Sequence, residues 1–288
     1  MKKIAIVTDS NSGITQEDAD KLGCFVVPMP FIIDAEIYFE GENLTQDKFY
    51  EIQSSGTRIT TSQPNINDIT DMWENLLKEY DEIVHISMSS GLSKSCETAQ
   101  GFAEQFGGKV QVVDNKRISI TMRASVVDAV NMAKDGKTAK QIKQYLEETA
   151  LDSSIYIMVD TLKYLKQGGR VTPAAAAIGA ILNIKPVLQI QGGKLDSYCK
   201  VINIKLAKNK IVDALRKDIE GRFRGIVEEG KLKLAVAHTR NDANAQLFAE
   251  ELKKEFPNLE VKFVDPLSLS VATHIGPKCL AAACFRVY

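Results

Sequence analysis

Strand-like and helix-like segments alternate along the first half of the chain, and this alternation constrains the fold more than any other feature. Residues 3–8 and 82–87 are short apolar runs of the kind that form buried strands. In residues 66–80 the apolar side chains recur at helical spacing and would form one face of a helix. Further helices are expected at 121–134 and 138–149. The alternation predicts a largely parallel sheet that helices cover on both faces.

The second half of the chain adds a β-hairpin to such units. Gly192 and Gly193 tolerate the positive φ angles of a tight turn, and strand-like runs flank them. We therefore predict an α/β protein with two α/β domains, 1–155 and 156–288, the first with a mainly parallel sheet and the second with a mixed sheet. The elements expected in the second domain are strands at 154–159, 186–191, 194–200, 232–238 and 259–264, and helices at 173–182, 204–224 and 242–255.

Composition restricts the class of protein. The apolar fraction of 44% and the charged fraction of 25% are those of an ordinary globular protein. A net charge of −1 argues against nucleic acid as the main partner. Asp9 ends the first apolar run too early for a signal peptide, and no stretch approaches the ~20 apolar residues of a membrane span. Because the five cysteines are odd in number and form no CxxC motif, we expect reduced thiols in a cytoplasmic protein.

Two hydroxyl-rich stretches, 58–64 and 89–93, are expected in loops, where α/β folds carry their function. Neither contains a carboxylate, cysteine or histidine, so their neutral donors suit binding of an anionic oxygen better than bond breaking. Ser93 would begin the helix expected at 93–106, next to the carboxyl end of a strand, where ligands of open α/β sheets bind. A helix N-terminus there offers N–H groups to an anion. The alternative is that Ser93 only caps its own helix.

Thr61 and Arg170 are further candidates for contact with an anion. Thr61 lies in the first hydroxyl-rich stretch, three residues before Pro64, where a turn residue is the common interpretation. Arg170 follows two glycines and could grip a carboxylate or phosphate, although most arginines only lie on surfaces. The small side chains of residues 174–181 indicate either close helix packing or room for an apolar ligand.

The three histidines differ in context. His85 lies inside an apolar strand pattern and is interpreted as a core residue, whereas His238 ends a strand and fits either role. His274 precedes a Gly-Pro turn signal and could donate a hydrogen bond or a charge to a carboxylate; a purely structural role is the alternative.

An enzyme is the main rival interpretation, either a hydrolase using Ser93 or Thr61 with His274, or a phosphate-handling protein using Asp9. A nucleophilic serine needs a base that a third group orients. No acidic residue stands beside His274 in the sequence, since Asp265 lies nine residues before it, and this spacing argues against a hydrolase. The sequence has no GxSxG, P-loop or GxGxxG motif and no cluster with metal-ligand spacing. We expect no catalytic residue, metal or cofactor.

An ordered set of motifs along the whole chain resembles the DegV family of bacterial fatty-acid-binding proteins. The resemblance implies two α/β domains with one long-chain fatty acid bound between them. It implies that Thr61, Ser93 and His274 hold the carboxylate, that Arg170 lies near the head group, and that the protein itself performs no chemistry. The motifs are Thr8-Asp9-Ser10, Thr61-Ser62-Gln63-Pro64, Ser89-Ser90-Gly91-Leu92-Ser93, Gly168-Gly169-Arg170, Ile184-Lys185-Pro186-Val187-Leu188, the Gly193-Lys194 hairpin, and His274-Ile275-Gly276-Pro277.

Three positions depart from the family pattern. Lys94 and Lys278 stand where the family usually has glycine, so they either add positive charge near the carboxylate or point to solvent. Some members present the bound acid to a fatty-acid kinase, and these tend to carry arginine where this chain has Ile202. The resemblance thus leaves a kinase partner open.

Overall fold

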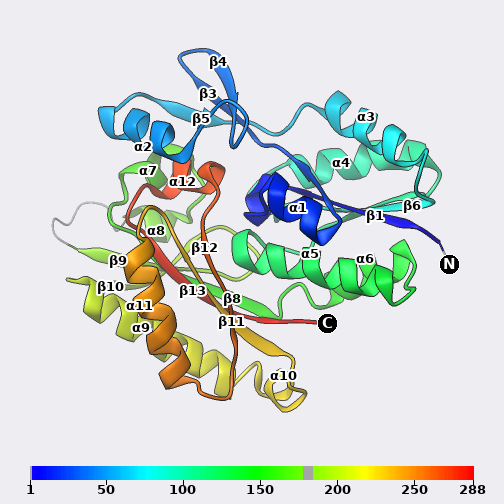
Figure 1. Cartoon of the computed structure of the whole chain (residues 1–288). Helices are drawn as coiled ribbons and strands as arrows, with labels where there is room; N and C mark the ends of the chain where they lie inside the picture. Colours follow the sequence, from blue (N-terminus) through cyan, green and yellow to red (C-terminus); the bar gives the residue numbers. More distant parts are fainter. Residues whose placement is uncertain (1, 178–183) are drawn as a thin grey trace. The chain divides into compact units, whose positions relative to one another are not determined.

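The computed structural model describes residues 2–177 and 184–288, except for the side chain of Lys166. The chain groups into two compact units: Met1–Leu151 together with Tyr288, the first unit, and Asp152–Val287, the second unit. Figure 1 shows that both contain helices and strands. The end of the helix predicted at 173–182 lies outside the described residues.

The first unit is built on a four-stranded parallel sheet in the order β2-β1-β6-β7. Helices α3 and α4 pack on one face and α5 and α6 on the other (Figure 1). A separate antiparallel sheet has the order β4-β3-β5. The strands are β1 Ile4–Asp9, β2 Phe25–Val27, β3 Pro30–Ile33, β4 Glu36–Phe39, β5 Ile59–Thr61, β6 Glu82–Ile86 and β7 Val110–Val113; the helices are η1 Ser10–Ser12, α1 Gln16–Leu22, α2 Gln46–Ser55, α3 Ile66–Leu76, α4 Ser95–Ala103, η2 Glu104–Phe106, α5 Ser119–Lys134 and α6 Ala139–Glu148.

Trp73 is the centre of the core on one face of this sheet. It is fully buried on α3, and its ring packs edge-on against Phe106. Its Nε1 donates a hydrogen bond of 3.2 Å to Nδ1 of His85 on β6. Burial lowers the pKa of His85 to about 4, because an apolar interior disfavours the charged imidazolium. The interpretation of His85 as a core residue is confirmed.

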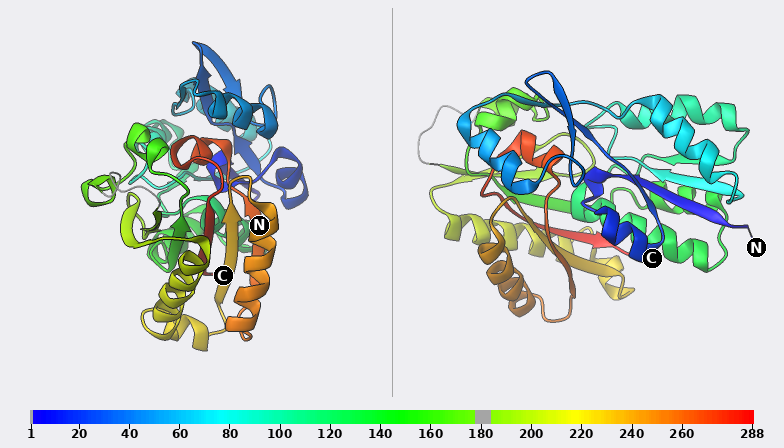
Figure 2. Two further views of the ribbon diagram at one scale, coloured as in Figure 1. Left: turned by 90° about the vertical axis from the view of Figure 1, so that its left-hand side faces the viewer. Right: turned by 45° about the horizontal axis from the view of Figure 1, so that its top comes forward.

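The second unit is built on a six-stranded mixed sheet in the order β10-β9-β8-β13-β11-β12. Strands β11 and β12 are parallel and the other neighbours antiparallel. Helices α9 and α11 lie side by side over one face of the sheet (Figure 2). The strands are β8 Ser153–Met158, β9 Lys185–Ile190, β10 Asp196–Val201, β11 Leu232–His238, β12 Val261–Pro266 and β13 Leu280–Arg286; the helices are α7 Lys163–Gly168, α8 Pro173–Ala177, α9 Ile204–Glu220, α10 Arg224–Glu228, α11 Asp242–Glu255 and α12 Leu269–Ile275.

The predicted fold class, with a parallel first sheet and a mixed second sheet, is confirmed, and several elements differ from the predictions. Thr61 is not in a loop: it ends β5 and pairs with Phe31 of β3, because the β-branched run at 59–61 finds a partner strand. The helix predicted from Ser93 begins at Ser95. The helix predicted at 204–224 ends at Glu220, and α10 follows as a separate helix.

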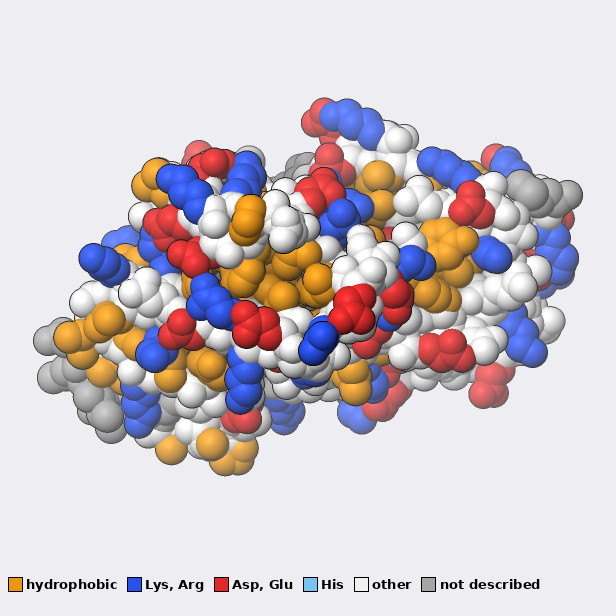
Figure 3. All heavy atoms as spheres, turned by 90° about the horizontal axis from the view of Figure 1, so that it is seen from below, with side chains coloured by type: hydrophobic (Ala, Val, Ile, Leu, Met, Phe, Trp, Pro, Cys, Tyr) orange, Lys and Arg blue, Asp and Glu red, His pale blue; other side chains and the backbone are white. Residues whose placement is uncertain are grey.

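The surface carries charges of both signs. On the face shown in Figure 3, acidic and basic side chains are interspersed, as expected for a chain with a net charge of −1. No helix in the described parts of the chain has the length and apolar character needed to cross a membrane.

Candidate ligand-binding site

A side-chain contact in the first unit ties the first hydroxyl-rich stretch to helix α4. Thr61 is half-buried at the end of β5, and Gln63 follows it. Oγ1 of Thr98, on α4, donates a hydrogen bond of 3.3 Å to Oε1 of Gln63. The segment after β5 is therefore tied to the helix that follows Ser93.

Ser93 is half-buried and lies two residues before the first residue of α4. The Ser95 N–H, at the first residue of the helix, donates to Oγ of Ser93 over 3.2 Å, but Lys94 occupies the N-cap position and no side chain caps the helix, so Ser93 is not the helix cap that the alternative interpretation expected. This bond uses the hydroxyl oxygen as an acceptor and leaves the O–H as a donor. The bond from Ser95 and a hydrogen bond from Ser93 to a ligand are thus compatible.

The loop before Ser93 is anchored to the loop between β7 and α5. The Ser89 N–H donates to the carbonyl of Arg117 over 2.9 Å. The Ser90 N–H donates to Oδ1 of Asp114 over 3.2 Å, and Nζ of Lys116 donates to Oγ of Ser90 over 2.5 Å. These bonds hold the serine-rich loop in one conformation.

Asp9 joins two strands. Its Oδ1 accepts from the backbone N–H and from Nδ2 of Asn11, at 2.9 and 2.7 Å. Its Oδ2 accepts from the Met88 N–H over 2.9 Å. The side chain is buried, and burial raises the pKa of this carboxyl. Its oxygens serve the connection between β1 and the residues after β6, which favours a structural role over phosphate or metal binding.

The second unit brings Arg170 and His274 together. His274 lies half-buried in the last turn of α12, and Arg170 follows α7, which packs against α12. Nη1 of Arg170 donates a hydrogen bond of 2.6 Å to the carbonyl of Gly168. Burial, and then the charge of Arg170, lower the pKa of His274 to about 4. At neutral pH the pair is therefore a guanidinium cation beside an uncharged imidazole.

The turn after His274 is held by Thr239, a residue that sequence reasoning missed. Oγ1 of Thr239 donates to the carbonyl of Gly276 over 2.7 Å and accepts from the Cys279 N–H over 2.9 Å. Thr239 is fully buried directly after β11. Its only sequence signal is a hydroxyl at the end of an apolar strand, which is too common to identify such an anchor.

His238 has a structural role. It is buried at the end of β11, and its Nδ1 accepts from the Asn241 N–H over 3.3 Å. Its Nε2 lies 3.7 Å from Oδ1 of Asp242. These contacts hold the turn between β11 and α11.

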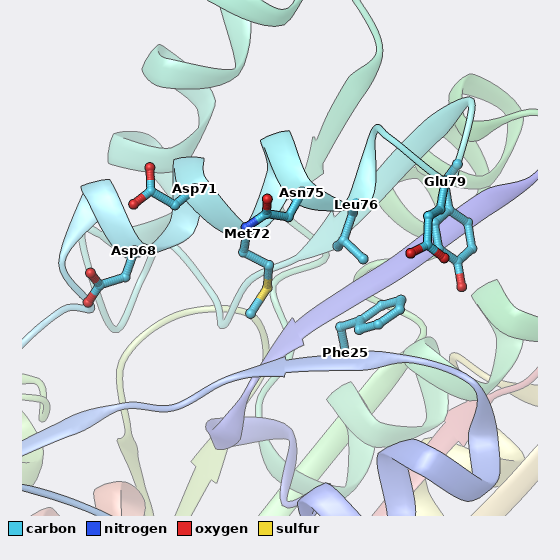
Figure 4. A pocket seen from close by; sticks show the side chains of 8 residues that line it. Phe25, Asp68, Asp71, Met72, Asn75, Leu76 and Glu79 are labelled. Carbon is cyan, nitrogen blue, oxygen red and sulfur yellow. The ribbon is translucent and has the colours of Figure 1, made fainter.

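A surface groove lies between α3 and β2, with a volume of about 560 Å³ (Figure 4). Helix α3 carries acidic residues and no lysine or arginine. A carboxylate ligand would be repelled by this rim, and no candidate site residue lies in it. The groove is lined by the apolar residues Phe25, Met72, Leu76 and Tyr80 and the polar residues Asp68, Asp71, Asn75 and Glu79.

Among the described residues, no group of three or more histidine, cysteine, aspartate or glutamate side chains could hold a metal ion.

Two α/β units, one on a parallel sheet and one on a mixed sheet, define the class of fold. A family model described as "Uncharacterised protein, DegV family" matches residues 3–287. The chain therefore belongs to the DegV family, which confirms the resemblance of its motifs. A DegV domain-containing protein of Listeria monocytogenes is 30% identical over 284 residues, which cover 97% of each chain.

Solved structures of the family share the fold. A DegV family protein from Thermus thermophilus, described by its fatty acid binding, has a TM-score of 0.87 and 26% identity, and the match covers 99% of this chain and 100% of that one. DegV of Bacillus subtilis, described as a fatty acid binding protein, has a TM-score of 0.85 at the same identity and coverage.

Proposed function

We propose that this protein binds a long-chain fatty acid non-covalently and performs no chemistry on it. Thr61 and Ser93 of the first unit and Arg170 and His274 of the second hold the carboxylate. The observation that carries the proposal is the Arg170–His274 pair, in a chain whose solved relatives are described as fatty acid binding proteins.

The chemistry of these side chains suits a single negative charge. Arg170 supplies a permanent cation, and neutral His274 can donate one hydrogen bond. The O–H of Ser93 is a further donor, since the bond from the Ser95 N–H uses only the hydroxyl oxygen. Each hydrogen bond to the charged group contributes roughly 1.5–3 kcal/mol.

The hydrocarbon tail dominates the affinity. Burial of about fifteen methylenes at ~0.8 kcal/mol each contributes on the order of 12 kcal/mol before ordering costs are subtracted. The tail therefore outweighs any one head-group contact. The head-group residues set the orientation of the ligand and its selectivity for an acid.

The test has two stages. Native mass spectrometry of protein purified from a lipid-containing host should show a bound fatty acid, and delipidated protein should take up palmitate. Ser93→Ala and His274→Ala should each weaken palmitate binding about 10-fold or more and change palmityl alcohol binding much less, because only the acid carries the charge that these donors meet.

Ser54→Ala, which changes an exposed serine on α2, is the matched control and should bind like the unchanged protein. A double-mutant cycle shows whether Ser93 and His274 act on one head group, because independent effects would simply add. Failure of any fatty acid to co-purify or load contradicts the proposed function. Equal losses for acid and alcohol contradict the assignment of these residues.

A kinase partner is outside the proposed function. Ile202 stands where kinase-using members tend to carry arginine, and the residue is 71% exposed directly after β10. An exposed isoleucine cannot make the charged contact that an arginine makes at that position.

A further inference from the structure

Two glycines mark places where α7 and α12 approach each other closely. A Cβ atom added to Gly168 would lie 2.3 Å from Nδ1 of His274. A Cβ atom added to Gly276 would lie 2.3 Å from the ring of Tyr164. Tyr164 and Gly168 are four residues apart on α7 and share one face of it. The imidazole thus occupies the space that any side chain at position 168 would fill.

Gly168 also contacts the arginine of the candidate site. Its carbonyl accepts the 2.6 Å hydrogen bond from Nη1 of Arg170. Gly168 therefore adjoins both candidate head-group residues of the second unit. Because it has no side chain, the imidazole of His274 can lie close to its Cα, and its backbone carbonyl binds the guanidinium of Arg170.

We propose that Gly168 is a positioning residue of the head-group site, which sets where the His274 imidazole and the Arg170 guanidinium lie. This inference rests on the proposed function and assigns to Gly168 a role that acts through His274 and Arg170. It predicts that any side chain at position 168 reduces selectivity for a carboxylate.

The neighbouring glycine has a different role. Gly169 has a φ of 65°, and nothing lies within 4 Å of a Cβ atom built on it. Its N–H donates to the carbonyl of Leu165 over 3.2 Å and ends α7. The left-handed backbone conformation thus requires glycine at position 169. Gly168 has no positive φ, so glycine is required there by the lack of space for a side chain.

Alanine at position 168 isolates the steric effect. Its backbone conformation is accessible to alanine, so the expected cost comes from the contact with His274. The imidazole must withdraw by roughly 1 Å to reach a normal non-bonded distance. Withdrawal weakens the burial or the Arg170 interaction that lowers the pKa of His274, so this pKa should rise from about 4 toward its ordinary value.

The experiment compares Gly168→Ala with Gly225→Ala, which alters a helical glycine on α10 with open space around it. NMR titration of the histidines should show a raised pKa only for His274 in Gly168→Ala, with His85 as the internal reference. Palmitate affinity should fall about 10-fold or more while palmityl alcohol affinity stays close to that of the control, because a displaced donor affects only the charged head group.

If Gly168→Ala folds poorly, the free energy of unfolding of this variant, with and without His274→Ala, tests the proposal instead. Removing the imidazole removes the steric conflict, so Gly168→Ala should cost less stability in a His274→Ala background than alone. An equal cost in both backgrounds overturns the proposal. So does an unchanged His274 pKa in a folded Gly168→Ala protein.

The readouts separate the two ideas. If the unchanged protein binds no fatty acid, the proposed function fails, while the His274 titration and the stability cycle still decide whether Gly168 positions the imidazole. If fatty acid binds but Gly168→Ala retains full preference for acid over alcohol, only the role of Gly168 is lost.

Discussion

At the scale of single residues, backbone geometry separates Lys94 and Lys278, the two lysines that stand where the family resemblance implies glycine. Lys278 has a φ of 61°, in the left-handed region that favours glycine. Lys94 has a φ of −79° and a ψ of −5°, which any residue adopts. The side chain of Lys94 is 79% exposed and pairs with Glu97 over 2.8 Å. The backbone conformation therefore favours glycine over lysine at position 278, but not at position 94.

Lys278→Gly should stabilise the protein. The left-handed conformation costs roughly 1–2 kcal/mol for a residue with a side chain, and the extra freedom of glycine in the unfolded chain offsets about 0.5–1 kcal/mol of that gain. We expect the free energy of unfolding, measured with urea, to rise by up to about 1.5 kcal/mol. Lys94→Gly is the control and should be neutral or destabilising; equal gains for both variants would contradict the conformational explanation.

At the scale of elements, the position of α12 depends on one buried hydroxyl. Thr239 bonds to the carbonyl of Gly276 and to the N–H of Cys279. Its backbone N–H also donates to the Cys279 carbonyl over 3.3 Å, and its carbonyl accepts from the Lys278 N–H over 2.7 Å. The end of α12 and the start of β13 are thereby fixed to the end of β11.

Thr239→Val should destabilise this junction. Valine keeps the shape of threonine but leaves a buried carbonyl and a buried N–H without their partner, at a cost of about 1–3 kcal/mol. Thr239→Ser keeps the hydroxyl and should lose less. Urea unfolding gives the free energies, and hydrogen exchange of the Cys279 amide should accelerate in the valine variant. Equal stability of the valine and serine variants would show that the hydroxyl is not the anchor.

At the scale of the whole molecule, each unit holds a histidine whose pKa is about 4, His85 in the first and His274 in the second. An unfolded histidine has a pKa of about 6.5. The unfolded chain therefore binds more protons between these values, and the free energy of unfolding rises with pH across that window. This stabilisation is fully present above about pH 6.5 and is lost as the pH falls toward 4.

Acidification should therefore weaken the fold, by on the order of 3 kcal/mol for fully buried His85. Urea unfolding at several pH values from about 7 to 4 measures this decline. In His85→Gln, whose amide can still accept a hydrogen bond from Trp73, the decline should be shallower. The same slope in both proteins would mean that His85 does not contribute.

Several features could be predicted from local sequence because their causes are local. Thr15 caps α1 and Gly23 ends it with a φ of 77°, which are residue types that commonly begin and end helices. The paired glycines join β9 and β10 in an antiparallel hairpin. The missed elements have non-local causes. Strand β13 is a run of small apolar residues without alternation, and it becomes a strand because β8 and β11 pair with it on both sides.

The sequence by itself determined the alternation of strands and helices in the first half, the parallel and mixed character of the two larger sheets, and the family, because periodicity and turn residues act over a few positions. Only the tertiary structure decided that Gly168 adjoins His274 and that Thr239 holds the turn after it. These contacts join residues far apart in the chain, and such proximity is set by the packing of α7, α12 and β11 rather than by any local pattern.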